Sequence, residues 1–273
     1  MIKQNVSRLL RLLHLSKTAD NVRFYFMYLK NFVDNYKFKK KHPDVILPPN
    51  YLMYESFQLN NNKYYSGGKE DALWVTDLVR PYITLQSSNI LDWGCGPARI
   101  IRHLPGILGT TNKYFGSDYN ASTVKWCKQH FPNISFTQNK ITPPLDFSEN
   151  YFQFIYGISV LTHLSRTNQD LWSKELNRLI APEGLVLLTT QGEAFMEKLT
   201  AREISLYKND ELVSRGNAPE GHRVYAAFQP PAYIRKVFID SGFEIVSHIP
   251  GKRVTESYIS QDVWLLKMKS YNS

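Results

Sequence analysis

The sequence predicts an α/β fold built on a doubly wound, mostly parallel sheet of seven strands, with an N-terminal helical extension. Three observations lead to this fold class. From residue 68 onward, short apolar runs alternate with segments of helical apolar spacing, which is typical of parallel strands joined by helices. A Gly-rich turn follows the first apolar run, where such folds bind ligands. The last two apolar runs lie near a Pro250-Gly251 turn and predict an antiparallel pair that closes the sheet.

Residues 1–45 predict a basic helical extension in front of the sheet. Leucines cluster over residues 5–15 and aromatic residues over residues 24–32, so both segments are expected to form helices with an apolar stripe. We expect these helices to pack on the main domain or on a second subunit, and an interfacial membrane helix is the alternative. Prolines at residues 43–49 predict a linker after the extension.

The alternating part of the chain predicts a definite series of elements. The expected helices cover residues 68–80, 98–104, 121–130, 168–180 and 231–241. The expected strands cover residues 89–92, 114–118, 134–138, 152–156, 184–190, 243–248 and 262–267. Asn120 is a favourable N-cap, and Pro231 is a favourable first helical residue. Residues 181–184 predict a tight turn before the fifth strand.

Residues 46–273 are expected to form one domain that contains the whole sheet. Residues 192–229 interrupt the alternation, since they are polar and rich in turn signals. Long insertions after a strand often lie over the strand ends and carry function. We therefore expect this insertion to form a lid or a wall of the substrate site.

The turn at residues 90–99 indicates the charge of its ligand. Asp92 ends the strand, and Arg99 stands where a dinucleotide-binding turn has its last glycine. A carboxylate about 4 Å from a pyrophosphate would repel it by roughly 4 kcal/mol at an effective dielectric near 20. S-adenosylmethionine (SAM) has a sulfonium and an ammonium group and no phosphate. The turn therefore favours SAM, and a nicotinamide oxidoreductase is disfavoured.

This segment resembles motif I of the class I SAM-dependent methyltransferases. The segments at residues 114–118, 134–139, 152–159 and 176–190 resemble the next motifs of the family, in the same order and at similar spacing. The resemblance covers roughly residues 68–268. Shorter words, among them Leu47-Pro48-Pro49, resemble a bacterial subgroup whose members are often associated with glycan or natural-product machinery.

The resemblance implies a Rossmann-like methyltransferase fold, SAM as the cofactor, and transfer of a methyl group to a small-molecule or glycan acceptor at oxygen. The cofactor-binding residues that it implies are Asp92, Gly94, Gly96, Asp118, Tyr119, Asn139 and Ser159. Within this set, the first three residues would lie near the methionine part, Asp118 at the ribose and Asn139 near the adenine. A strand-end carboxylate about 20 residues after the glycines suits ribose hydroxyls.

The sequence departs from the family pattern at several positions. Ala98 replaces a common glycine of motif I, and Gln153 replaces the usual acid of the fourth strand. Asn139 or Lys140 stands where many relatives have an acid near the adenine. The Asn/Asp-Pro-Pro-Tyr/Phe motif does not follow Tyr156, which argues against nucleic-acid bases and glutamine amide groups as acceptors.

Candidate residues for catalysis follow the fourth strand and the insertion. His163 is the candidate general base, because it follows the fourth strand and its ordinary pKa suits proton removal near neutral pH. A histidine that packs the loop is the alternative interpretation. His222, Tyr225 and Tyr233 are candidates for the acceptor pocket. No spacing of His, Cys, Asp or Glu predicts a metal site.

Composition limits the partners and the setting. The formal net charge is +9, of which +7 falls on residues 1–44, so the catalytic body is nearly neutral. This distribution argues against an extended nucleic-acid surface on the body, although a nucleic-acid methyltransferase and a non-catalytic SAM-binding scaffold stay open as alternatives. Two cysteines and no apolar run of about 20 residues favour a cytoplasmic protein. Residues 1–45 leave a peripheral contact with a membrane or a second subunit open.

Overall fold

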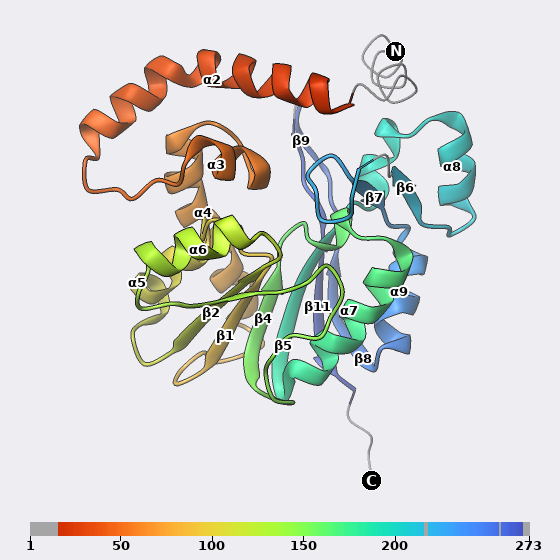
Figure 1. The fold of residues 1–273 in the computed structure, drawn as a ribbon. Helices are drawn as coiled ribbons and strands as arrows, with labels where there is room; N and C mark the ends of the chain where they lie inside the picture. Colours follow the sequence, from red (N-terminus) through yellow and green to blue (C-terminus); the bar gives the residue numbers. More distant parts are fainter. Residues whose placement is uncertain (1–15, 216–217, 257, 270–273) are drawn as a thin grey trace.

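The computed structural model describes residues 16–215, 218–256 and 258–269. At its centre lies a seven-stranded sheet with the strand order β3-β2-β1-β4-β5-β11-β8 (Figure 1). The strands are β1 (Asn89–Trp93), β2 (Lys113–Asp118), β3 (Ser135–Gln138), β4 (Phe152–Gly157), β5 (Ile180–Thr190), β8 (Phe243–Ile249) and β11 (Asp262–Met268). The five strands from β3 to β5 are parallel, and β11 is antiparallel to both of its neighbours. The predicted mostly parallel sheet is confirmed.

Helices cover both faces of the sheet, as a doubly wound fold requires (Figure 1). They are α4 (Asn61–Val79), α5 (Leu104–Leu108) and α6 (Ala121–His130) on one face, and α7 (Arg166–Leu179) and α9 (Pro231–Asp240) on the other. Successive strand residues point to opposite faces. Accordingly, Ile90 lies in the core under α4 and α6, whereas Leu91 lies in the core under α7 and α9.

Local signals place several elements as expected. The helix predicted for residues 121–130 is α6, and the Asn120 side chain accepts hydrogen bonds from the N–H groups of Ser122 and Thr123. Pro231 is the first residue of α9. Both cases follow from capping chemistry, because an N-cap oxygen or a proline suits the unpaired N–H groups of a first turn.

Three elements differ from the predictions. α4 begins at Asn61 rather than at residue 68, because the Asn60 side chain caps it by accepting from the N–H of Lys63. The helix expected at residues 98–104 is instead a 3₁₀ turn (Ile101–His103) followed by the short α5. The tight turn expected at residues 181–184 lies inside β5, as a register shift in its pairing with β4.

The N-terminal region is a helical cap on the carboxyl edge of the sheet. α2 (Ser16–Lys41) is much longer than the helix expected at residues 24–32, and α3 (Asn50–Ser56) forms in the segment expected to be a linker. The helix predicted for residues 5–15 lies outside the described residues. Figure 1 shows α2 and α3 above the sheet, at the end where β5 leads into the insertion.

The insertion folds into a small unit with its own apolar core. It contains a 3₁₀ segment (Glu193–Lys198), α8 (Ala201–Lys208), and the hairpin of β6 (Val213–Arg215) and β7 (Ala226–Phe228). A second hairpin, β9 (Arg253–Thr255) with β10 (Tyr258–Ile259), packs Ile259 into this core. Among the described residues, no helix is long and apolar enough to cross a membrane.

Candidate active site

The two strand-end carboxylates lie on neighbouring strands, two positions apart in register. β1 and β2 are paired in parallel, with Asp92 opposite Gly116 and Trp93 opposite Ser117. Both carboxyl groups are buried. Burial raises the pKa of Asp92 to about 7 and the pKa of Asp118 to about 6, because a charged carboxylate loses its hydration there. A cationic ligand at this edge would favour the ionised form of both groups.

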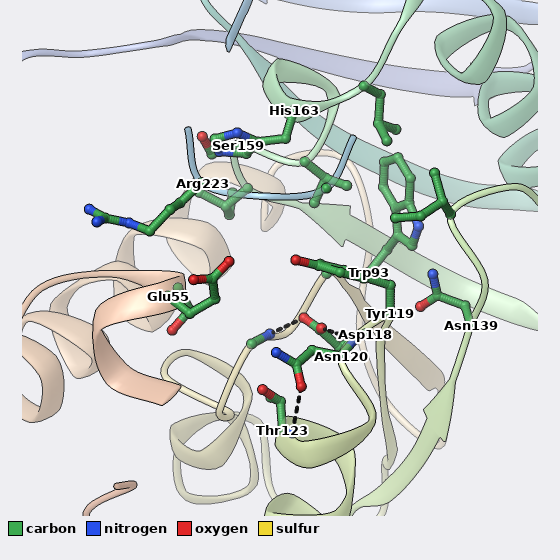
Figure 2. A pocket seen from close by; sticks show the side chains of 18 of the residues that line it. Glu55, Trp93, Asp118, Tyr119, Asn120, Thr123, Asn139, Ser159, His163 and Arg223 are labelled. Atoms are coloured by element: carbon green, nitrogen blue, oxygen red, sulfur yellow. Dashed lines mark hydrogen bonds between the residues drawn. The ribbon is translucent and has the colours of Figure 1, made fainter. Parts of the chain in front are cut away.

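Asp118 is held by the backbone around it. Its Oδ2 accepts a hydrogen bond from the N–H of Gly96 at 2.9 Å, and its Oδ1 accepts from the N–H of Asn120 at 2.8 Å (Figure 2). A carboxylate oxygen can accept more than one hydrogen bond. Both oxygens of Asp118 can therefore still accept from a pair of ligand hydroxyls while the backbone fixes the carboxylate plane.

The Gly-rich turn needs its first glycine for two reasons. Gly94 has φ +76°, in the left-handed region that favours glycine, and a Cβ atom there would lie 2.4 Å from a methyl carbon of Val160. The N–H groups of Gly94 and Cys95 both donate to the carbonyl of Ser117. The turn is thus tied to the end of β2. The Cys95 thiol is buried, and burial raises its pKa, so it has no thiolate character.

A first cavity of about 180 Å³ opens against these strand ends (Figure 2). It brings together most of the residues that the sequence predicted: Gly94, Gly96, Asp118, Tyr119, Asn139, Ser159 and His163. Trp93 and Trp172 add an apolar wall, with ring centroids 5.0 Å apart. The crevice between the tips of β1 and β2 is therefore open to a ligand.

Asn139 presents an unpaired acceptor in the first cavity. Its Nδ2 donates to the carbonyl of Lys140 at 2.7 Å, which fixes the orientation of the amide, since a carbonyl can only accept. Its Oδ1 is buried and has no hydrogen-bond partner among the described residues. A buried acceptor of this kind suits a ligand with an N–H donor, such as the amino group of adenine. The residues present therefore fit the adenosyl part of SAM.

A second, larger cavity of about 780 Å³ adjoins the first. The residues that line both cavities are Ser56, Gly94, Gly96, Ile158 and Ser159. We call this set the shared rim. Asp92 lines the second cavity and not the first, so each cavity has one of the two strand-end carboxylates.

Ser159 on the shared rim is held in a strained conformation by a chain of hydrogen bonds. It is a non-glycine residue with φ +64°, and its N–H donates to Oγ1 of Thr189 at 2.7 Å. The Thr189 hydroxyl then donates to Oε1 of Gln261 at 2.6 Å, and the Gln261 amide donates to Oγ of Ser159 at 2.9 Å. Since the first donor in this ring can only donate, the direction of each bond is determined. Ser159, Thr189 and Gln261 all line the second cavity.

His163 is a neutral imidazole in a determined tautomer. Its Nδ1 lies 2.7 Å from the carbonyl oxygen of Tyr225, so Nδ1 carries the proton and Nε2 has the lone pair. Burial lowers the pKa of His163, because the charged form is poorly solvated there. Figure 2 shows His163 and Ser159 on the side of the cavity opposite Asp118 and Asn120.

The three residues predicted for the acceptor pocket do not meet in either cavity. His222 lies beside the first cavity with its Nε2 3.7 Å from a carboxylate oxygen of Glu55. Tyr225 contributes the carbonyl that holds His163, rather than its ring. Tyr233 is buried in the core near α9, with the Arg166 guanidinium 5.0 Å from its ring centroid. Tyr233 is in the first turn of α9, on the buried face of that helix.

Two residues of the first cavity were not predicted from the sequence. Glu55 at the end of α3 points into it (Figure 2), and its charge is one cause of the raised pKa of Asp118. Arg223 of the insertion lines it as well. The Arg223 guanidinium lies 2.7 Å from a carboxylate oxygen of Asp20 and 3.8 Å from the ring centroid of Tyr54. The insertion and the N-terminal helices therefore meet over this cavity.

Among the described residues, no group of three or more His, Cys, Asp or Glu side chains could hold a metal ion. Arg99, which follows the Gly-rich turn, is in an ion pair with Asp71 at 2.6 Å. The titratable side chains that line the two cavities include Arg223 in the first and Arg99 and Lys252 in the second, besides the carboxylates and His163.

The sequence of residues 90–184, from β1 into β5, matches the family model of the methyltransferase domain. Among solved structures, the chain is similar to a SAM-dependent methyltransferase from Methanosarcina mazei, with a TM-score of 0.56 and 17% identity, covering 71% of this chain and 98% of that one. The chain is also similar to a SAM-dependent methyltransferase from Clostridium acetobutylicum, with a TM-score of 0.51 and 9% identity, covering 75% of this chain and 92% of that one. A glycopeptide N-methyltransferase is similar with a TM-score of 0.52 and 12% identity, covering 74% of this chain and 90% of that one. At these identities the structural likeness is one of fold.

Proposed function

We propose that this chain is a SAM-dependent methyltransferase that uses S-adenosylmethionine as its cofactor, as the match of residues 90–184 to the methyltransferase-domain model supports, and that it methylates an oxygen of a small-molecule or glycan acceptor bound in the second cavity. One observation carries the proposal. Two cavities of different chemistry share a rim at the Gly-rich turn and Ser159, so a donor in one can face an acceptor in the other.

The first cavity is the proposed site of the adenosyl part. Asp118 would accept from the two ribose hydroxyls, and Oδ1 of Asn139 would accept from the adenine amino group. Tyr119 and the two tryptophans would pack against the ring. Gly94, Gly96 and Ser159 on the shared rim would border the methionine part, with Asp92 as the nearest carboxylate on the far side.

When bound, SAM supplies a methyl group on a positively charged sulfur, which a nucleophile can displace. The contribution of the chain is then mainly alignment, which can be worth several kcal/mol. The hydrogen-bonded ring of Ser159, Thr189 and Gln261 fixes the wall on which an acceptor would lie. The remaining N–H of the Gln261 amide is free to orient an acceptor oxygen.

The chemistry of the second cavity supports a polyhydroxylated acceptor. Trp74 from α4 offers an aromatic surface that is 40% exposed, and Tyr258 offers one that is 57% exposed. Carboxylates of Glu70 and Asp71 and the amide of Gln261 line the same cavity. Aromatic faces combined with planar acceptors suit a ring that carries hydroxyl groups.

His163 is the proposed general base, through the lone pair on Nε2; it lines the first cavity on the same side as Ser159 of the shared rim and would act across that rim. The Tyr225 carbonyl holds the proton on the other nitrogen, so the imidazole is in the tautomer that a base requires. Its lowered pKa keeps the ring neutral at pH 7. Residues 46–273 would then be the catalytic domain, with the insertion as a wall that contributes Arg223 to one cavity and Phe195 to the other.

The acceptor can be identified with methyl-labelled SAM. The full-length protein is incubated with labelled SAM and fractions of small molecules or glycans, and products that gain one labelled methyl are sought by mass spectrometry. With the acceptor in hand, Trp74→Ala is expected to raise its KM by roughly tenfold while the Kd for SAM changes less than twofold. Leu171→Ala is the control, because this side chain is equally exposed but lies on α7, outside both cavities. A label on nitrogen, or a Trp74→Ala variant with wild-type KM, would contradict the proposal.

A further inference from the structure

The outer face of α2 is apolar, and no other part of residues 16–215, 218–256 and 258–269 covers it. Seven large side chains on this helix are each 54–71% exposed: Val22, Tyr25, Phe26, Leu29, Phe32, Val33 and Tyr36. Their spacing of three and four residues places them on one stripe of the helix. Figure 1 shows α2 along one end of the molecule, with no other described element beyond its outer side. An apolar stripe of this size on a soluble surface marks an interaction site.

The rotation of α2 is fixed by bonds on its inner face. The Asn35 side chain donates to the carbonyl of Leu59 and accepts from the N–H of Asn61. One turn away, Oδ1 of Asn31 accepts from the side chain of Asn60. These amides face the domain, so the helix cannot roll its aromatic stripe inward without leaving buried polar groups unpaired. The outward position of the stripe is therefore built into the sequence.

Basic residues flank this stripe. Arg23, Lys30 and Lys37 recur every seven residues and are exposed in a row beside the apolar side chains. Lys39, Lys40 and Lys41 follow in the last turn. Of the acids on α2, Asp34 is exposed, whereas Asp20 is already paired with Arg223. The outer face therefore combines apolar rings with a net positive charge.

We propose that α2 lies in the surface of an anionic lipid membrane, with its aromatic stripe among the acyl chains and its basic row at the lipid phosphates. Phe, Leu and Tyr on one side with Lys and Arg beside them is the composition of an interfacial helix. Long basic side chains can reach headgroups while their stems cover apolar surface. Lysine side chains close to the membrane surface are attracted to anionic lipid, and the attraction acts at short range.

Charge argues against a second copy of the chain as the occupant. Two α2 helices packed stripe to stripe would bring two basic rows together, and Asp34 is the one exposed acid that each described helix could offer in exchange. An anionic surface, in contrast, is complementary to every basic residue of the row. The ion pair of Asp20 with Arg223 ties the docked helix to the cofactor cavity, so a bound α2 holds the active site close to the membrane.

Vesicle sedimentation of the full-length protein tests the proposal. We expect binding to vesicles that mix phosphatidylcholine with phosphatidylglycerol, at least roughly tenfold tighter than binding to phosphatidylcholine alone, and weakening with salt. Leu29→Glu is expected to weaken binding by roughly tenfold or more, because it places a charge in the stripe. The pair Lys30→Gln and Lys37→Gln is expected to lower binding to the anionic vesicles by a similar factor and to leave binding to neutral vesicles unchanged.

The matched control is Ile239→Glu, an exposed apolar residue on α9 that is 49% exposed and far from α2 in the fold. It is expected to bind vesicles like the wild type. Unchanged SAM affinity and melting temperature of Leu29→Glu would show that this variant is folded. The proposal is overturned if the wild type does not sediment with anionic vesicles, or if Leu29→Glu sediments as well as the wild type. It is also overturned if the wild type is a dimer by light scattering that Leu29→Glu converts to a monomer.

Discussion

The two cavities at the carboxyl edge of the sheet are built from different kinds of chain. The first rests on strand ends and on the turns that follow them, with Asp118, Tyr119 and Asn139 all at such positions. The second is closed by α4, the insertion and the β9–β10 hairpin, which provide Trp74, Phe195 and Tyr258. The proposed donor side of the site is thus set by the sheet itself, whereas the proposed acceptor side is set by additions to it.

The two strand-end carboxylates also differ between the two cavities. Asp118 in the first cavity receives two backbone hydrogen bonds. Asp92 in the second cavity is also buried, and its pKa is the higher of the two. A buried carboxylate is costly when ionised unless other groups donate to it or a cation lies near it. We infer that Asp92 depends more on its ligand than Asp118 does.

The largest expected effect separates turnover from binding. His163→Ala, and His163→Gln as the variant that can still donate to the Tyr225 carbonyl, are expected to lower kcat by roughly a hundredfold, because a general base is lost. The Kd for SAM should change much less than kcat, although His163 lines the first cavity. Calorimetry with SAM and a methyl-transfer assay measure the two quantities. Wild-type turnover across the pH range in His163→Gln would remove this residue as the base.

The next effect belongs to the first cavity alone. Asp118→Ala is expected to weaken SAM binding by at least roughly tenfold, because two charge-assisted hydrogen bonds to the ribose are lost. The KM of the acceptor should stay near the wild-type value. Calorimetry measures the affinity, and Asp77→Ala is the control, since that exposed carboxylate lies on α4 away from the strand ends. Equal SAM affinities in both variants would show that Asp118 does not bind the ribose.

The pH dependence of SAM binding should follow the same carboxyl group. The pKa of Asp118 is about 6 without ligand, so the group is ionised at pH 7 and mostly protonated at pH 5. A protonated carboxyl has neither the charge nor the full acceptor capacity of a carboxylate. SAM affinity is therefore expected to fall by roughly tenfold from pH 7 to pH 5. In Asp118→Asn this part of the decline should be absent, and an equally steep decline there would assign the titration to another group.

The smallest expected effect is a change in the free energy of unfolding in a variant of Asp92. Its pKa is raised to about 7 by burial, so its contribution to stability is greatest at low pH and is lost as the pH rises through 7. At pH 8 without SAM, Asp92→Asn is therefore expected to raise the free energy of unfolding by roughly 1–3 kcal/mol. Urea unfolding of both proteins at pH 5 and pH 8 tests the sign. A variant that is less stable than the wild type at pH 8 would show that the ionised carboxylate is well compensated in the folded state.

The sequence alone predicts well the strand ends and turns that line the first cavity. The motif order fixes which strand ends are neighbours, and the spacing between the glycines and Asp118 already brings both groups to one edge. Asn120 and Pro231 predict where two helices begin, and the structure confirms both helix starts. The sheet and the match of residues 90–184 to the methyltransferase-domain model follow from such local patterns, whereas the SAM cofactor and the narrower bacterial subgroup stay predictions.

The walls contributed by the insertion and the N-terminal helices depend on contacts between distant residues, which no local sequence pattern predicts. Arg223 binds Asp20 across 203 residues, and α3, which provides Glu55, is a helix of only seven residues within a Pro-rich segment. Tyr233 illustrates the opposite error, because an aromatic residue after the insertion suggests a pocket while its helix turns it into the core. Pocket walls made by distant segments depend on tertiary packing, which apolar periodicity does not encode.

A crystal structure with SAM bound tests the central claim most directly. We predict the ribose hydroxyls at hydrogen-bond distance from Asp118, the adenine amino group at Oδ1 of Asn139, and the methyl group directed across the shared rim into the second cavity. Adenine in the second cavity, or a methyl group directed away from it, would contradict the assignment of donor and acceptor to the two cavities.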